Sequence, residues 1–136
     1  MSAFLDTNIL VYAVDKRDPT KYERAIVAVE KQIGDGSGVI STQVLQEFAS
    51  VALGKLHQRV DVVMAELLAL ESLEVVQLTP ALIRRGLEFH ALHRMSVWDG
   101  AILAAAEAAR CTRLWSEDFI PGSIYGLLRV ENPLAG

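Results

Sequence analysis

The sequence has a single cysteine, Cys111, few aromatic residues and no long uninterrupted run of hydrophobic residues. One cysteine cannot form an internal disulfide bond, so we interpret Cys111 as a small core residue of a protein from a reducing compartment. No stretch approaches the roughly 20 consecutive apolar residues that a transmembrane helix needs. The first residues also lack the basic and apolar segments of a secretion signal. These absences predict a cytoplasmic protein that does not enter a membrane.

An excess of basic residues is absent too. The chain has 13 Lys and Arg residues against 17 Asp and Glu residues, and its formal net charge is −4. Proteins that are drawn to nucleic acid through its phosphates usually have a basic patch or a high pI, so non-specific attraction to RNA or DNA is not expected. A nucleic-acid substrate is still compatible with this charge if several acids converge on a divalent cation, because the ion cancels their charge locally.

The length of 136 residues suits one domain with one core, and we expect residues 1–136 to form a single domain. Apolar patterns predict helices that alternate with short strands, and the strands are expected at 1–6, 39–40, 74–78, 112–116 and 127–130. The helices are expected at 9–13, 19–33, 42–56, 61–72, 79–92 and 97–110. Strands of this continuous apolar kind are typical of a parallel sheet that is covered on both faces. The sequence therefore predicts an α/β fold, a three-layer α/β/α sandwich around a mainly parallel sheet of four to five strands.

The first expected strand ends abruptly in a carboxylate. Asp6 is followed by Thr7 and Asn8 before apolar residues resume at Ile9. Ligands of an open α/β sheet bind at the carboxyl ends of its strands, so Asp6 would point into the binding crevice. Alternatively, Asp6 only caps the following helix, because Asp, Asn and Thr all favour the position before a helix. This stretch alone leaves both roles open.

Three further acids follow the ends of expected elements, and each has an ordinary explanation of its own. Asp99 lies three residues after Ser96 and matches a helix-capping box. Glu47 flanks the apolar stripe of its helix, and Asp118 suits a turn after the fourth strand. Together with Asp6, however, they predict a cluster of carboxylates at one crevice. Such a cluster suits Mg²⁺ or Mn²⁺, which prefer oxygen ligands and can activate water against a phosphodiester.

Four stretches carry a resemblance to the PIN domain family, namely Asp6-Thr7-Asn8, residues 41–48, Trp98-Asp99 with the alanine-rich helix behind it, and residues 114–119. Within that family the chain most resembles the VapC-type toxins of bacterial toxin–antitoxin pairs, because residues 122–133 are also similar to theirs. The resemblance implies a PIN-like α/β/α fold and a Mg²⁺- or Mn²⁺-dependent endoribonuclease that hydrolyses RNA. It also implies a cognate antitoxin as partner and a homodimer.

The same resemblance implies which residues form the site. The catalytic acids and metal ligands would be Asp6, Glu47, Asp99 and Asp118. Thr7 and Asn8 would hold the first of these acids in place by hydrogen bonds. Ser116 would supply the hydroxyl of the family's hydroxyl-any-acid pattern, in which threonine is usual. Glu117 directly precedes the fourth acid and competes with it for the metal.

Two other functions start from similar residues. A non-catalytic PIN-like module would bind a protein partner and use its acids as helix caps and surface charge. An aspartyl phosphatase of the haloacid dehalogenase type also begins with an Asp after a buried strand. That chemistry needs a second Asp two residues further on, where this chain has Asn8.

The remaining polar and aromatic residues are expected to have structural roles. His57, His90 and His93 are interpreted as surface or packing residues. Trp98 and Trp115 are expected to be buried in packing rather than to stack on bases. The available contacts to an RNA backbone are Lys16, Arg17, Lys55, Arg59, Arg84, Arg85 and Arg94.

Overall fold

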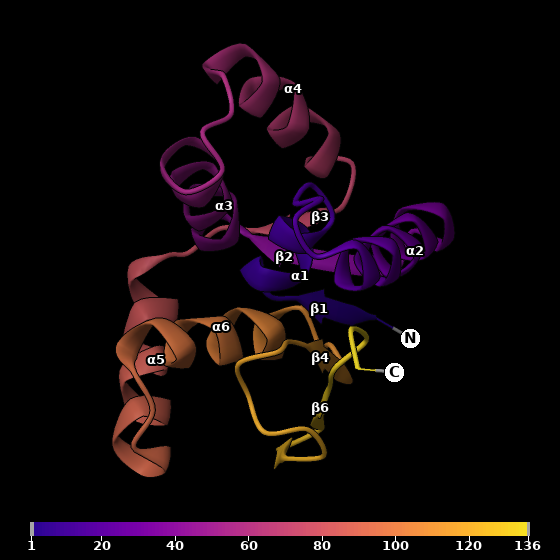
Figure 1. Cartoon of the computed structure of the whole chain (residues 1–136). Coiled ribbons are helices and arrows are strands. Elements are labelled where there is room, and N and C mark those ends of the chain that lie inside the picture. Colours follow the sequence, from indigo (N-terminus) through magenta and orange to yellow (C-terminus); the bar gives the residue numbers. More distant parts are fainter. Residues whose placement is uncertain (1, 136) are drawn as a thin grey trace.

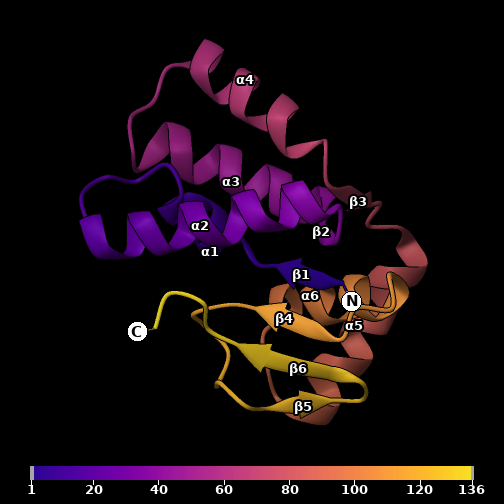
Figure 2. The same cartoon turned by 90° about the vertical axis from the view of Figure 1, so that its right-hand side faces the viewer.

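A computed structural model describes residues 2–135 and contains one central sheet. The strands are β1 (Ala3–Leu5), β2 (Gly38–Ser41), β3 (Glu74–Val76), β4 (Arg113–Trp115), β5 (Ile124–Tyr125) and β6 (Leu128–Glu131). Their order in the sheet is β3-β2-β1-β4-β6-β5, which can be followed from one edge to the other in Figure 2. All neighbouring pairs from β3 to β6 are parallel, and β5 alone is antiparallel, to β6.

The helices cover both faces of this sheet. They are α1 (Thr7–Tyr12), α2 (Pro19–Asp35), α3 (Thr42–Gly54), α4 (Val60–Leu70), α5 (Pro80–His93) and α6 (Val97–Ala108). Figure 1 shows α2 on one side of the strands, and α3 and α6 on the other, with α5 outside α6. Helix α4 packs on α3 beyond the β3 edge. The α/β/α arrangement predicted from the sequence is confirmed. Within residues 2–135, no helix is long and apolar enough to span a membrane.

Short polar side chains begin four of the helices. The side chains of Asp18, Ser41, Thr79 and Ser96 each accept a hydrogen bond from the backbone N–H three residues further on, and they begin α2, α3, α5 and α6. These bonds satisfy N–H groups that have no partner inside the helix. Because Ser41 ends β2 and also caps α3, it fixes the point at which the strand becomes the helix that carries Glu47.

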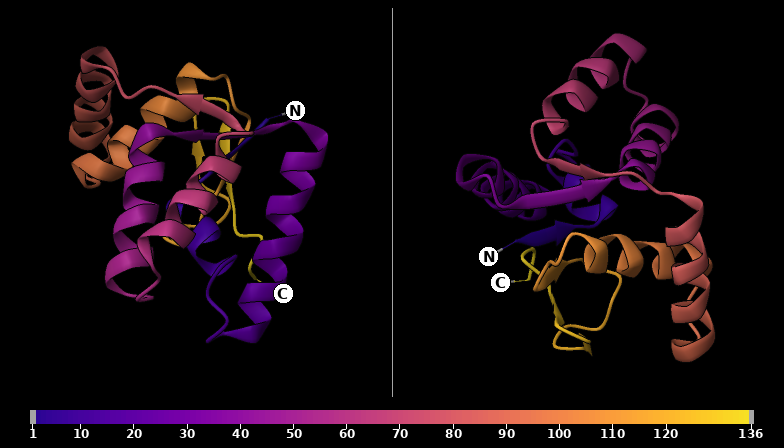
Figure 3. Two further views of the ribbon diagram at one scale, coloured as in Figure 1. Left: turned by 90° about the horizontal axis from the view of Figure 1, so that it is seen from above. Right: turned by 180° about the vertical axis from the view of Figure 1, so that it is seen from behind.

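Helix α6 is the most buried helix, since every residue from Gly100 to Ala106 is buried. It crosses α5 at a contact between two glycines, and Figure 3 shows this crossing from behind. A Cβ atom on Gly100 would lie 2.2 Å from the carbonyl oxygen of Gly86. Only glycine allows the two backbones to come this close. This close packing of α6 on α5 fixes the position of Asp99, which directly precedes Gly100.

Two smaller predictions about packing are confirmed and one strand is new. Cys111 is buried, and burial raises the pKa of its thiol to about 12, so it is no nucleophile. His93 stacks on the ring of Phe89 and makes an edge contact with the ring of Tyr125. The sequence predicted four to five strands, and the additional strand is β5, which has only two residues and no periodicity to detect.

Candidate active site

The site begins where β1 and β4 lie side by side. After β1 the chain continues toward one edge of the sheet, to β2, and after β4 it continues toward the other edge, to β5 and β6. Ligands of open α/β sheets usually bind at the carboxyl ends of two such strands. Asp6 directly follows β1 and is buried, with 6% of its surface exposed. Its Oδ1 accepts a hydrogen bond of 2.8 Å from the Thr7 backbone N–H, and its Oδ2 accepts one of 2.8 Å from the Ser116 hydroxyl. Asp6 therefore both caps α1 and joins the ends of the two strands.

A hydrogen-bond network continues from Ser116 to the next acid. The Ser116 oxygen accepts from the Asp118 backbone N–H at 3.0 Å. The Asn8 amide donates to Asp118 Oδ2 at 3.0 Å, while its oxygen accepts from the Glu117 backbone N–H at 3.2 Å. Asn8 thus orients Asp118, and Thr7 holds Asp6 through its backbone, because the Thr7 hydroxyl has no hydrogen-bond partner among the described residues.

Asp99 approaches this network from the first turn of α6. Burial raises the pKa of its carboxyl, a hydrogen bond with Ser96 opposes the rise, and the negative charge of Asp118 adds to it. The pKa of Asp6 is raised to about 6, first by burial and then by the charges of Asp118 and Asp99, against the hydrogen bonds from its neighbours. Three carboxylates on three separate segments therefore lie close enough to repel one another.

Glu47 faces the same region from α3. Its Oε1 accepts a hydrogen bond of 2.8 Å from Gln43, whose amide also donates to the backbone carbonyl of Trp98 at 3.1 Å. Gln43 thereby links the helix of Glu47 to the first turn of α6. Sequence reasoning missed Gln43, although its position one helical turn before Glu47 was a usable signal.

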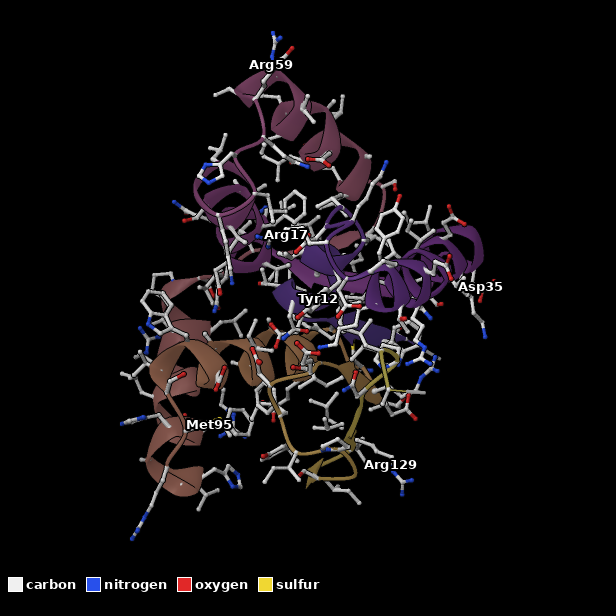
Figure 4. All side chains as sticks on the ribbon, viewed as in Figure 1. Tyr12, Arg17, Asp35, Arg59, Met95 and Arg129 are labelled. Atoms are coloured by element: carbon white, nitrogen blue, oxygen red, sulfur yellow. The ribbon has the colours of Figure 1, made fainter. Side chains whose placement is uncertain are left out.

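A groove of about 340 Å³ lies beside these residues, and Asp6 and Asp99 are not among the residues that line it. Glu47, Asp118 and Asn8 line it together with two cations, Arg17 and Lys55. Figure 4 shows Arg17 in the region between α2 and α3. Its guanidinium donates two hydrogen bonds of 2.8 Å to the carboxylate of Asp15. Of the cations that the sequence offered for an RNA backbone, these two line the acidic groove.

Comparison with known protein families identifies the family of the chain. The pattern of the PIN domain family matches residues 3–120. The chain belongs to this family. No curated protein matches the chain.

Solved structures resemble this PIN domain along most of its length. The toxin–antitoxin complex from Klebsiella pneumoniae has a TM-score of 0.72 and 23% identity, over 97% of this chain and 98% of that chain. VapBC2 from Rickettsia felis, bound to a DNA fragment from its promoter, has a TM-score of 0.67 and 22% identity over 97% and 98%. VapC20 from Mycobacterium tuberculosis, a sarcin-ricin loop cleaving toxin, has a TM-score of 0.68 and 18% identity over 86% and 92%. At these identities the likeness confirms the fold.

The acids of this PIN domain fit a hard divalent cation. Within residues 2–135, no three His, Cys, Asp or Glu side chains are close enough to enclose an ion by themselves. Mg²⁺ does not require such a cage, because it keeps several waters and takes one or two carboxylates together with substrate phosphates. All donors at the site are oxygens, and the pKa values of Asp6 and Asp99 are raised first by burial and then by neighbouring carboxylates, a combination that a bound cation would offset.

The prediction for one of the two tryptophans is wrong. Trp115 is buried at the end of β4, as expected, and donates to Glu131 at 3.0 Å. Trp98, however, is 65% exposed. The buried face of α6 begins only at Gly100, so the residues of its first turn extend beyond the core. The exposure of Trp98 could not be predicted from its residue type, because it depends on where α6 enters the core.

Proposed function

We propose that this PIN domain is an endoribonuclease that hydrolyses RNA phosphodiester bonds with Mg²⁺ or Mn²⁺. The acids that would hold the metal, directly or through its water ligands, are Asp6, Glu47, Asp99 and Asp118. The observation that supports this most directly is that the Ser116 hydroxyl links the buried carboxylate of Asp6 to the backbone of Asp118, while the charges of Asp118 and Asp99 act on the same carboxylate. A buried carboxylate near like charges is costly unless a cation or a proton compensates it, and a metal site supplies that cation.

The residues of the chain would divide the work in the following way. A bound divalent cation lowers the pKa of a water ligand and neutralises charge on the phosphate. Ser116 and the Thr7 backbone keep both oxygens of Asp6 in a fixed orientation, and Asn8 does the same for Asp118. Orientation of this kind by neighbouring groups strengthens metal binding.

The substrate would approach along the groove that Glu47 and Asp118 line. Lys55 and Arg17 lie in the same groove, so they can contact backbone phosphates on either side of the bond that is cut. A net charge of −4 leaves little general attraction to RNA, and binding would depend on these local cations and on the metal.

The similar structures also suggest the biological setting. Two are toxin–antitoxin complexes, and a third is a toxin that cleaves the sarcin-ricin loop. We propose that this PIN domain is likewise the toxin of a type II toxin–antitoxin pair, a cytoplasmic homodimer that a cognate antitoxin blocks. The alternative is a non-catalytic PIN-like interaction module. Such a module would not require carboxylates so near to one another that they repel. An aspartyl phosphatase lacks its second acid, since Asn8 occupies that position and binds Asp118.

The test combines cleavage and metal binding. The purified protein should cut a single-stranded RNA that carries a fluorophore and a quencher when Mn²⁺ or Mg²⁺ is added, and Asp99→Asn should abolish cleavage. Calorimetric titration with Mn²⁺ should give heat that is lost in the same variant. Asp61→Asn is the matched control, because Asp61 is an exposed acid on α4 that pairs with Arg59. Cleavage by Asp99→Asn at the wild-type rate would contradict the proposal, and absence of carboxylate-dependent heat would favour the interaction module.

A further inference from the structure

A second groove meets the acidic groove at Glu47, which lines both. It has a volume of about 590 Å³ and lies where α3 begins, where β3 leads toward α5 and where α6 starts. Apart from Glu47 its lining is uncharged, with Trp98 and Leu78 beside the polar side chains of Thr42 and Gln46. The two grooves therefore differ in chemistry, because the first contains cations and the second contains an aromatic ring among neutral polar groups.

Trp98 is fixed at its backbone and free at its ring. The carbonyl of Trp98 accepts a hydrogen bond of 3.1 Å from Gln43, which is itself 7% exposed and also binds Glu47. The side chain is 65% exposed, although tryptophan is highly buried on average. A large flat ring on an anchored backbone gives a binding surface that loses little conformational freedom when a ligand stacks on it.

The position of the ring relative to the acids defines what it can contact. Trp98 directly precedes Asp99, and its groove shares Glu47 with the groove of Asp118. An RNA strand whose phosphate lies between these acids would have its adjoining bases within reach of the second groove. Unpaired bases are typically recognised by stacking on aromatic rings and by hydrogen bonds to their edges, and Thr42 and Gln46 supply the polar groups for such bonds.

We infer that Trp98 is a stacking platform for an unpaired nucleobase next to the phosphate that is cut. The inference rests on the proposed function and adds to it a residue that would contact a base of the substrate. The acidic groove would hold the backbone through Arg17 and Lys55, and the groove of Trp98 would hold the base. Binding to this groove would then discriminate against paired RNA.

The experiment measures RNA binding rather than cleavage. A short, fluorescein-labelled single-stranded RNA is titrated with protein in the presence of Mn²⁺ and followed by anisotropy, with every protein carrying Asp118→Asn to prevent cleavage. Trp98→Leu keeps an apolar side chain without a π face and should raise the Kd about 5- to 100-fold. Trp98→Phe keeps a smaller ring and should recover most of the affinity. Leu68→Ala is the control, because Leu68 is 70% exposed on α4 and lines neither groove.

Each outcome separates the inference from the function on which it rests. Equal Kd values for Trp98→Leu and its parent, with cleavage intact in the protein that keeps Asp118, overturn the role of Trp98 and leave the nuclease proposal standing. A changed oligomeric state of Trp98→Leu in light scattering, with an unchanged Kd, assigns the ring to a protein interface and also overturns it. A wild-type protein that neither cuts nor binds RNA overturns both proposals. Loss of affinity in Trp98→Leu at an unchanged unfolding temperature, with recovery in Trp98→Phe, supports the platform.

Discussion

Lys21 Nζ lies 2.6 Å from Glu117 Oε2, and this ion pair ties Glu117 to the first turns of α2. The neighbouring acid, Asp118, instead accepts a hydrogen bond from Asn8 and raises the pKa values of Asp6 and Asp99. Two consecutive acids thus serve different partners. The sequence left open which of them is the fourth acid of the site, and this division of contacts favours Asp118.

Substitution of Asp118 should therefore lower the cleavage rate far more than substitution of Glu117. Asp118→Asn removes a carboxylate from the proposed metal site and should lower the cleavage rate by about 100-fold or more. Glu117→Gln removes the ion pair with Lys21 but keeps a polar side chain of the same size in the groove, and should change the rate by less than about threefold, since partly exposed ion pairs contribute little to stability. Both rates are measured on the same fluorogenic RNA at saturating Mn²⁺. The reverse ranking would assign the fourth position to Glu117.

Ser116 should act on the metal through Asp6 rather than by contact with it. Ser116→Ala removes the hydroxyl that donates to Asp6 and accepts from the Asp118 N–H, so Mn²⁺ affinity in calorimetry should fall about 10- to 100-fold. Ser116→Thr keeps the hydroxyl and should bind Mn²⁺ within a few-fold of wild type. If Ser116→Ala binds Mn²⁺ normally, the hydroxyl does not position the acids.

Much of the architecture could be predicted because it depends on local patterns. Helix starts at Ser41, Thr79 and Ser96 follow from capping chemistry, and the short apolar strands between helices are typical of a parallel sheet. The acids could be proposed from the same map, because carboxyl ends of parallel strands share one edge.

The parts that sequence could not predict depend on contacts between distant segments. The pairing of Lys21 with Glu117 spans 96 positions, and nothing near either residue indicates it. Exposure of Trp98 depends on how far α6 extends past the core. The contact of Gly86 with Gly100 has no signal in periodicity, because it exists only once α5 and α6 are packed.

That glycine contact should matter for stability. Gly100→Ala would place a Cβ atom 2.2 Å from the Gly86 carbonyl oxygen, so α5 and α6 must move apart, at a cost of about 1–3 kcal/mol. Gly34→Ala is the matched control within α2, where a Cβ atom would meet nothing within 4 Å, and should stabilise the protein by about 0.5–1 kcal/mol. Urea unfolding of the two variants measures both effects. Equal stabilities would show that the helices adjust without cost.

The raised pKa of Asp6 leads to a stability prediction whose sign depends on pH and metal. Between its ordinary value of 3.8 and its folded value of about 6, the folded protein binds more protons at Asp6 than the unfolded chain, so stability falls as pH rises through this range. At pH 7.5 in EDTA the cost approaches about 3 kcal/mol, because each pKa unit corresponds to about 1.4 kcal/mol.

Asp6→Asn cannot ionise and should remove this cost. In EDTA its unfolding free energy should exceed that of wild type by about 1–3 kcal/mol at pH 7.5, because the buried charge is gone, and the advantage should vanish near pH 4, where wild-type Asp6 is protonated. Added Mn²⁺ should reverse the order at pH 7.5, since a cation that binds only the folded wild type stabilises it. Urea unfolding across this pH range, with Asp61→Asn as the exposed control, measures all three effects. An advantage of Asp6→Asn that persists unchanged at pH 4 would mean that packing, not charge, distinguishes the variant from wild type.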